Sequence, residues 1–311
     1  MKMRLLQSFK VISPLWVMAV IGAFPFWSQC QPRQFRLPTE VQEASGLYIE
    51  DEEHFWWIND SGDGPFLYRT DTSRVLRERI EIPHAFNKDW EDITHDDQGR
   101  IYIGDFGNNY HARQNLRIYI WDPQTHHTDS ILFNYQDQCD FPPAYRRRNF
   151  NMEAFFWHND SLHLFSKPDQ RYKPLATKHY VLPAQPGKYA AVLRDTLDTP
   201  HRVVTGAAIS PDGQTVALVA YKFTLQWGFI PTSRTTVYLL QDFPAGHFLK
   251  GKVSKLPLRS TGKGPTQYEA IDFFDDETLY LGSERTLMYW QQVRRMYIKK
   301  YKVKPTRSPE K

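Results

Sequence analysis

The sequence predicts an all-β protein of the β-propeller class, with five four-stranded blades favoured. Five segments, each opened by an acidic or small residue and continued by an apolar run, begin at residues 43, 91, 153, 206 and 269. These openings lie 48 to 63 residues apart, and a four-stranded blade needs about 40–50 residues, with loops taking up the rest. No apolar 3.6-residue periodicity extends over a helix length after residue 30, which argues against helices.

Each blade is expected to contain four short strands rich in Val, Ile, Tyr, Phe and Trp, separated by Asp-Gly, Asn-Asp and Pro turn signals. The strands of the first blade are expected at 44–50, 55–59, 66–70 and 75–82. Those of the second are expected at 92–95, 101–104, 117–121 and 130–135. The third blade would use 154–158, 162–165, 179–182 and 190–197, and the fourth 207–210, 216–220, 236–240 and 252–258.

The fifth blade shows only three clear strands, at 270–274, 279–282 and 287–290. A strand at 34–37 stands alone before the first blade, so it is expected to close the fifth blade from the outside. Residues 296–303 compete for that place. Six blades would require one hidden in a long loop, so the propeller is expected to have five blades and to span 34–293.

Residues 1–30 match a bacterial export signal, because three basic residues precede an apolar stretch at 11–27. Cys30 lies where the acylated cysteine of a lipoprotein lies, although Gln29 is unusual just before it. A retained membrane-spanning anchor is the alternative, but the stretch is short and two prolines interrupt it. The protein is therefore expected in the periplasm or cell envelope, held at a membrane by a lipid on Cys30.

The chain has 311 residues and a formal net charge of +4, which is unevenly distributed. Residues 30–293 sum to −6, whereas residues 1–29 carry +3 and residues 294–311 carry +7. The last segment is expected to be a basic tail, either a solvated end or a contact for anionic lipid or polyanions. A monomer without a nucleic-acid partner is expected. Cys139 is the only cysteine besides Cys30, so no disulfide framework is expected.

The blade openings supply carboxylates that would converge on the propeller axis. The expected metal ligands are Glu91, Glu153 and Glu269, with Ser45 or Glu43 from the first blade. Carboxylates a few ångströms apart raise one another's pKa or require a cation, and oxygen ligands suit calcium better than zinc. The fourth blade offers only main-chain carbonyls at 206–207. The alternative is that these glutamates cap strand amides or pair with basic side chains.

Polar residues follow the second strands and would surround the same mouth. Asp60 and Asp105 are candidate proton acceptors, although turn residues of this kind also form local hydrogen bonds. The candidates for binding an anionic small molecule are Lys167, Arg285, Lys222 and Asn108. The lysines have a simpler interpretation as solvated surface residues. The histidines show no metal-ligand spacing.

These openings resemble the calcium-activated nucleotidase (apyrase) family of five-bladed propellers. The resemblance rests on Ser45 in Glu-Ala-Ser-Gly-Leu, Glu91, Glu153 in Met-Glu-Ala and Glu269 in Tyr-Glu-Ala-Ile-Asp. It implies a calcium ion held in the central channel by a serine and glutamates, and hydrolysis of nucleoside di- and triphosphates. The chain departs from the pattern at Gly206, where the family would offer a serine. It is also similar to the phytase-like and strictosidine-synthase-like propellers of exported bacterial proteins.

Three functional hypotheses follow. The first is a calcium-dependent hydrolase of a phosphorylated small molecule, in which calcium orients a water and Asp105 or Asp60 accepts its proton. The second is a non-catalytic binding propeller in which calcium is structural. The third is a metal-free scaffold that displays exposed tryptophans to a partner or glycan; the candidates are Trp56, Trp57, Trp227 and Trp290.

Overall fold

The structure is a computed structural model that describes residues 34–171, 175–226, 230–258, 266–286 and 289–302. The expected export signal, Cys30 and Trp227 lie outside these residues. The described part contains twenty β-strands and three short 3₁₀ turns, η1 (Tyr145–Arg147), η2 (Phe248–Lys250) and η3 (Lys299–Tyr301), and no α-helix. No helical segment of the described residues is long and apolar enough to cross a membrane.

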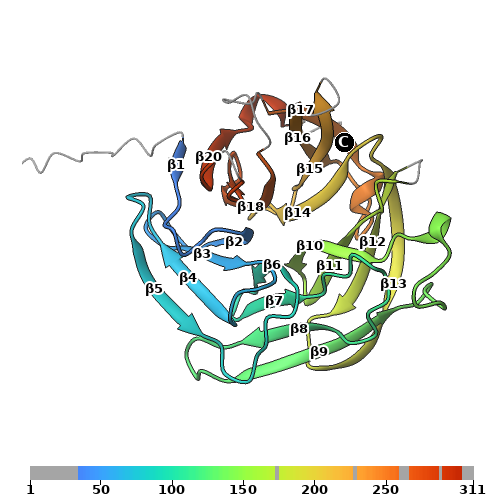
Figure 1. The fold of residues 1–311 in the computed structure, drawn as a ribbon, viewed down its shortest axis with the longest axis horizontal. Helices are drawn as coiled ribbons and strands as arrows, with labels where there is room; N and C mark the ends of the chain where they lie inside the picture. Colours follow the sequence, from blue (N-terminus) through green and yellow to red (C-terminus); the bar gives the residue numbers. More distant parts are fainter. Residues whose placement is uncertain (1–33, 172–174, 227–229, 259–265, 287–288, 303–311) are drawn as a thin grey trace, which may run out of the picture. The chain divides into compact units, whose positions relative to one another are not determined.

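The strands follow one another as antiparallel neighbours, in sets of four (Figure 1). The first set is β2 (Ala44–Ile49), β3 (Phe55–Asn59), β4 (Phe66–Thr70) and β5 (Leu76–Glu81). The second is β6 (Trp90–His95), β7 (Ile101–Asp105), β8 (Leu116–Trp121) and β9 (Thr128–Tyr135). The third is β10 (Asn151–His158), β11 (Ser161–Lys167), β12 (Ala176–Pro183) and β13 (Gly187–Asp198). The fourth is β14 (Val203–Ile209), β15 (Thr215–Gln226), β16 (Ile230–Gln241) and β17 (Lys252–Pro257).

The second and third sets join into one eight-stranded sheet, because their outer strands β9 and β13 pair in parallel. This pairing gives hydrogen-bond partners to two strand edges that would otherwise be open. The other sets remain separate four-stranded sheets.

The last sheet consists of β18 (Tyr268–Asp275), β19 (Thr278–Ser283), β20 (Gln292–Tyr297) and the N-terminal strand β1 (Gln34–Arg36). The expected closure by the N-terminal strand is confirmed, because β1 pairs antiparallel with β20 as the outermost strand. The third strand was wrongly expected at 287–290, and it lies instead at 292–297. The sheet therefore continues beyond residue 293, and the basic residues Arg294 and Arg295 belong to a strand rather than to a tail.

The first strand of each set contacts the first strand of the next. β2 contacts β6, β6 contacts β10, β10 contacts β14, β14 contacts β18, and β18 contacts β2. Residues of all these strands line one cavity of about 240 Å³. Four-stranded antiparallel sheets around a closed ring of inner strands are the organisation of a β-propeller. The predicted all-β propeller class is confirmed.

Buried aspartates link neighbouring inner strands. Asp92 Oδ2 accepts a hydrogen bond from the backbone N–H of Phe155 at 3.0 Å, and Asp272 Oδ2 accepts one from that of Ile49 at 2.8 Å. Burial raises the pKa of Asp92 well above its usual value and that of Asp272 to about 7. Each carboxyl satisfies a backbone donor that points across the gap between two sheets.

Aromatic side chains fill the space between successive sheets. Trp57, Trp90 and Trp121 are fully buried in these layers. Trp56 is also buried, so the suggestion that Trp56 and Trp57 are displayed at the surface is wrong. Of the tryptophans proposed for display, Trp290 alone among the described residues is exposed.

Candidate functional site

Every inner strand is interrupted by a β-bulge at the same place. The register shifts between the residues on either side of one bulge residue in β2, β6, β10, β14 and β18. A bulge residue leaves the ladder, and its side chain is redirected from the face that strand alternation would give it. The five bulge residues are Ser45, Glu91, Glu153, Thr205 and Glu269.

The fourth bulge residue corrects the sequence analysis, which placed this position at Gly206 and found no side chain there. Thr205 occupies it, and its Oγ1 donates a hydrogen bond to the carbonyl oxygen of Tyr268 at 3.2 Å. Ser45 Oγ makes the same contact with the carbonyl of Trp90, also at 3.2 Å. A Cβ at Gly206 would lie 2.2 Å from the carbonyl oxygen of Glu269, so only glycine fits there.

Ser45, not Glu43, is the equivalent residue of the first blade. Glu43 precedes β2 and its side chain is exposed. Partial burial and then the charges of Asp60, Asp63 and Glu269 raise the pKa of Glu43, which places it near the rim of the same acidic region.

The three bulge glutamates are almost completely buried, with exposed fractions of 3% for Glu91, 2% for Glu153 and 4% for Glu269. One of them, Glu153, pairs with an ammonium group of the protein itself. Lys167 Nζ lies 2.6 Å from Glu153 Oε2, and Asn151 Nδ2 donates to Glu153 Oε1 at 2.5 Å. The alternative pairing with basic residues is therefore present at Glu153.

The charges of this cluster act strongly on one another. Burial raises the pKa of Glu153 to about 7, although Lys167 opposes the shift. Burial alone would lower the pKa of Lys167, but Glu153, Tyr221, Glu269 and Glu91 hold it well above its usual value. Lys167 is thus a charged, carboxylate-bound cation within the cluster.

A second group of carboxylates lies beside Glu91. Asp60, Asp89 and Glu91 each offer an oxygen within 4.8 Å of the others. Burial, then Glu153 and Asp60, raise the pKa of Glu91 well above its usual value. Burial and then Asp60 raise the pKa of Asp89 to about 6, and burial also raises the pKa of Asp60. Asp60, Asp89 and Glu91 are called the acidic mouth below. Such a set of hard oxygen donors fits a divalent cation.

Two members of the acidic region were missed by the sequence analysis. Asp89 stands two residues before Glu91, and this spacing could have indicated it. Glu284 follows β19, and burial and then Glu269 raise its pKa well above the usual value. Gln267 Nε2 donates to Glu269 Oε1 at 3.2 Å and to Glu284 Oε2 at 3.3 Å, which ties these two carboxyls together.

Gly107 allows two carboxyls of the acidic mouth to approach the backbone closely. A Cβ there would lie 2.2 Å from Glu91 Oε1 and 2.4 Å from Asp89 Cγ. The backbone N–H of Gly107 donates to the carbonyl of Asp89 at 3.1 Å, which fixes this close approach. The residues present fit a bound cation, since three carboxylate oxygens converge and the missing side chain at Gly107 permits the close approach of two of the carboxyls.

Gly107→Ala is expected to weaken cation binding at the acidic mouth about tenfold or more, because the added methyl displaces two of the three ligands. Isothermal titration with calcium measures the effect. Gly99→Ala is the control, because its Cβ meets nothing within 4 Å and its φ of +80° makes the substitution costly for stability alone. Equal calcium affinity in Gly107→Ala and the native protein would contradict this assignment.

Two other predicted site residues have structural roles. Asp105 Oδ1 lies 3.0 Å from Arg113 Nη2 and accepts from the backbone N–H of Asp89 at 3.1 Å. Asn108 donates from Nδ2 to the Phe150 carbonyl, and its Oδ1 accepts from two backbone N–H groups. A catalytic Asp105 and a substrate-binding Asn108 are therefore not supported by their contacts.

Arg285 and Lys222 lie apart from these contacts. The guanidinium of exposed Arg285 stacks over Trp290, 4.6 Å from the ring centroid, and its backbone N–H donates to Gln42. Lys222 is half-buried on β15, directly across from Arg234 of β16. The structure brings Lys167 alone of the three predicted cations into hydrogen-bond contact with a bulge glutamate.

A separate buried network was not foreseen, because its members are brought together only by pairing of β11, β12 and β13. His163 Nδ1 lies 2.9 Å from His179 Nε2, and His179 Nδ1 lies 2.8 Å from Asp195 Oδ1. Burial lowers the pKa of His163 to about 2 and also lowers that of His179. These imidazoles are neutral core groups, and within the described residues only the acidic mouth has three metal-ligand atoms in mutual reach.

No protein-family model matches the chain, and no curated protein matches it. Solved structures match at low identity. One is an alpha-L-arabinanase from Penicillium chrysogenum complexed with arabinobiose, 10% identical over 86% of this chain and 99% of that one, with a TM-score of 0.49. A gluconolactonase from Xanthomonas campestris is 12% identical over 85% and 89%, with a TM-score of 0.44. A PQQ-bound aldose sugar dehydrogenase from Streptomyces coelicolor is 8% identical over 84% and 96%, with a TM-score of 0.45. Since none of these scores reaches 0.5, the fold assignment rests on the strand pairing described above.

Proposed function

We propose that this protein is a five-bladed propeller of the cell envelope that binds a divalent cation, calcium, at its acidic mouth. The observation that carries the proposal is the convergence of oxygens from Asp60, Asp89 and Glu91 within 4.8 Å. Carboxylates so close together raise one another's pKa, and a divalent cation relieves that repulsion. Three protein carboxylates with water and carbonyl oxygens completing the shell are a typical calcium environment.

The blade count is supported by the equivalence of the bulges. Five inner strands carry a bulge residue at the equivalent position, and β18 contacts β2. The eight-stranded sheet then counts as two blades whose outer strands pair.

The ligand of the propeller is, in this proposal, a small anionic molecule that carries phosphate. Bound calcium would neutralise part of the phosphate charge. Lys167 lies in the same acidic region and remains charged, held by Glu153. Two positive charges in one region favour oxyanions over neutral ligands.

Isothermal titration of the metal-free protein with calcium tests the site. One calcium ion per chain is expected, and Asp60→Asn with Glu91→Gln should lower the affinity about a hundredfold. A matched control removes two exposed carboxylates elsewhere, Glu53→Gln with Asp97→Asn, and should bind calcium as the native protein does. An absence of calcium binding, or equal losses in both double variants, would overturn the proposal.

Hydrolysis of the bound phosphorylated molecule is a second candidate function, favoured by one observation. The pKa of Glu153 is raised to about 7 by burial, and a group that titrates near neutrality suits general acid–base catalysis. The resemblance to calcium-activated nucleotidases points the same way. Calcium-dependent phosphate release from nucleoside diphosphates, lost in Glu153→Gln, would support it; binding of the nucleotide without turnover would leave the binding function alone.

Export and anchoring belong to the same proposal. Residues 1–30 would direct the chain out of the cytoplasm, and a lipid on Cys30 would hold a monomer at the membrane. Metabolic labelling with a radioactive fatty acid tests this, since Cys30→Ser should abolish incorporation while Cys139→Ser leaves it unchanged. Label in neither native protein nor control would exclude lipidation.

A further inference from the structure

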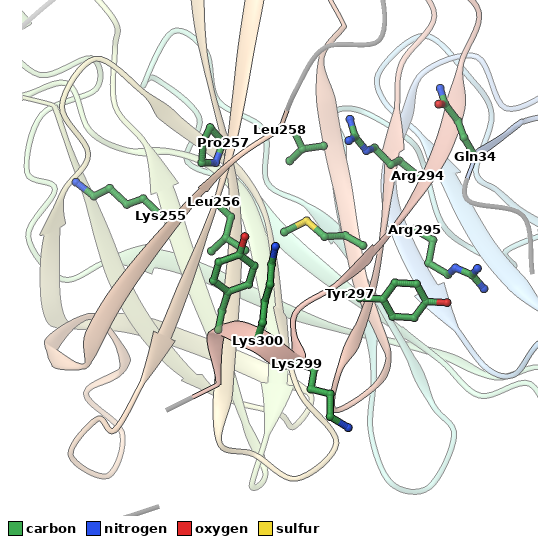
Figure 2. A pocket seen from close by; sticks show the side chains of 12 residues that line it. Gln34, Lys255, Leu256, Pro257, Leu258, Arg294, Arg295, Tyr297, Lys299 and Lys300 are labelled. Carbon is green, nitrogen blue, oxygen red and sulfur yellow. The ribbon is translucent and has the colours of Figure 1, made fainter. Parts of the chain in front are cut away.

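A large basic groove lies between the last two sheets, away from the acidic mouth. It has a volume of about 1090 Å³ and runs between β17 on one side and β20 with η3 on the other. Five basic side chains line it: Lys255, Arg294, Arg295, Lys299 and Lys300. Figure 2 shows Lys255 and Arg295 on opposite sides of the groove and Lys300 rising between them. These five residues are called the basic groove below.

The positive charge of the basic groove is only partly compensated. Lys299 pairs with Glu277 at 3.0 Å, but the lysine side chain is highly exposed. No acidic residue is among those that line the groove in the described part of the chain. Arg295 hydrogen-bonds with the side chain of Tyr280, and its Nε atom is buried. The groups of the basic groove that are open to an external anion are therefore the exposed ammonium groups of Lys299 and Lys300.

Exposed tyrosines stand beside these cations. Tyr297 and Tyr301 line the groove and have exposed fractions of 53% and 37%. The guanidinium of Arg295 lies 5.0 Å from the ring centroid of Tyr297, and the ammonium of Lys300 lies 4.8 Å from that of Tyr301. Amphipathic rings next to long basic side chains are suited to the interfacial region of a bilayer, where phosphates and apolar chains meet.

The chain itself indicates which anion is near. Gln34 of β1 lines the groove, and Cys30, the proposed site of the lipid, lies four residues earlier. Four extended residues span at most about 14 Å. A lipid on Cys30 would therefore keep Gln34, at the edge of the groove, within about 14 Å of the membrane surface.

We propose that the basic groove binds the phosphate headgroups of anionic phospholipids and fixes the orientation of the propeller at the membrane. The inference rests on the anchoring part of the proposed function. It adds a second, charge-dependent contact to the anchor, and two such signals together give stable attachment where one alone is marginal. Basic residues that follow, Lys304 and Arg307, would add to the same electrostatic attraction.

The test is vesicle sedimentation of the full-length protein. Vesicles of phosphatidylcholine alone are compared with vesicles containing phosphatidylglycerol, at about 50 mM and about 500 mM salt. The native protein is expected to bind the anionic vesicles about tenfold or more tightly at low salt, and this advantage should nearly vanish at high salt. Lys255→Gln, Lys299→Gln and Lys300→Gln together should remove most of the advantage.

The control carries the same change of net charge on other surfaces, through Arg74→Gln, Arg146→Gln and Lys188→Gln, all exposed. It should keep the preference for anionic vesicles, and thermal melts should show both triple variants folded. Equal losses in the two variants, or no preference in the native protein, would overturn the groove assignment. If millimolar glycerol phosphate displaced the protein from the vesicles, the assignment of the ligand as a lipid would be overturned, and a soluble phosphate would be identified as the ligand instead. If the native protein did not bind phosphatidylcholine vesicles, the proposed N-terminal anchor would be contradicted. The groove assignment would stand, because the preference for anionic lipid is measured separately.

Discussion

Calcium is expected to raise the melting temperature of the metal-free protein strongly at pH 8 and only slightly at pH 5. At a free concentration a hundredfold above the dissociation constant, a ligand of the folded state contributes about 2.7 kcal/mol. For a domain of this size that corresponds to a shift of about 5–10 °C. The effect depends on pH because calcium needs ionised carboxylates, and protons compete for the same oxygens.

The sign follows from the raised pKa values of the acidic mouth. Burial and repulsion raise the pKa of Asp89 to about 6 and that of Glu91 well above its usual value. Carboxyls with a raised folded-state pKa stabilise the fold fully below the unfolded value near 4, and this contribution is lost as the pH rises through the folded value. The metal-free protein is therefore less stable at pH 8 than at pH 5, and bound calcium offsets this loss of stability.

Differential scanning calorimetry with calcium or with a chelator, at both pH values, measures the shift. A variant with Asp60→Asn, Asp89→Asn and Glu91→Gln should show no calcium-dependent shift at either pH. Its metal-free form should also lose less stability than the native protein between pH 5 and pH 8. A calcium shift of the same size at both pH values, or one retained in the triple variant, would exclude the acidic mouth as the site.

The inner strands could be predicted from sequence because their signal is local. Each buried run lies next to turn residues, as where Asp96 to Gly99 separates β6 from β7. β20 could not be found in this way. It carries Arg294 and Arg295 in its centre and owes its place to pairing with β19 and β1 on its two sides. Tertiary context decides such strands, since edge and outer positions tolerate charged side chains.

The acidic site could be located in part. The recurring glutamates indicated the converging positions, but Thr205 was misplaced by one residue because a bulge shifts which side chain leaves the ladder. Once the bulge is known, the starts of the inner strands can be aligned by a shared order of bulge residue, small residue and apolar residue, as in Thr205-Gly206-Ala207. Asp89 joins the site through the loop before β6, and the fold alone brings it to Asp60.

Lys167→Met is expected to destabilise the metal-free protein by about 3–5 kcal/mol. Its ammonium lies 2.6 Å from Glu153 Oε2 and both groups are largely shielded from water. Removal of one partner leaves an uncompensated buried carboxylate, which costs much more than the net stabilisation by the intact pair. Urea unfolding at pH 8 measures the effect. At this pH Glu153, with a pKa of about 7, is ionised, so protonation of its carboxyl does not reduce the loss of stability.

The double variant Lys167→Met with Glu153→Gln should recover much of this stability, because it removes both charges and leaves Asn151 a neutral partner. Lys167→Arg keeps the charge and is the conservative control. If Lys167→Met unfolded at the same urea concentration as the native protein, Lys167 would not be the cation that compensates these glutamates.

The same substitution separates the two cations that the acidic region can hold. Lys167 lowers the pKa of Glu91, a calcium ligand in the proposal, so its positive charge opposes a second cation nearby. Coupling between two sites is reciprocal, so Lys167→Met should bind calcium more tightly than the native protein, and calcium should restore part of its stability. If calcium binding weakened instead, Lys167 would be supporting the ligand geometry rather than competing with the ion. The ammonium of Lys167 and the bound ion therefore both neutralise the acidic cluster, and the repulsion between them lowers the calcium affinity of the mouth.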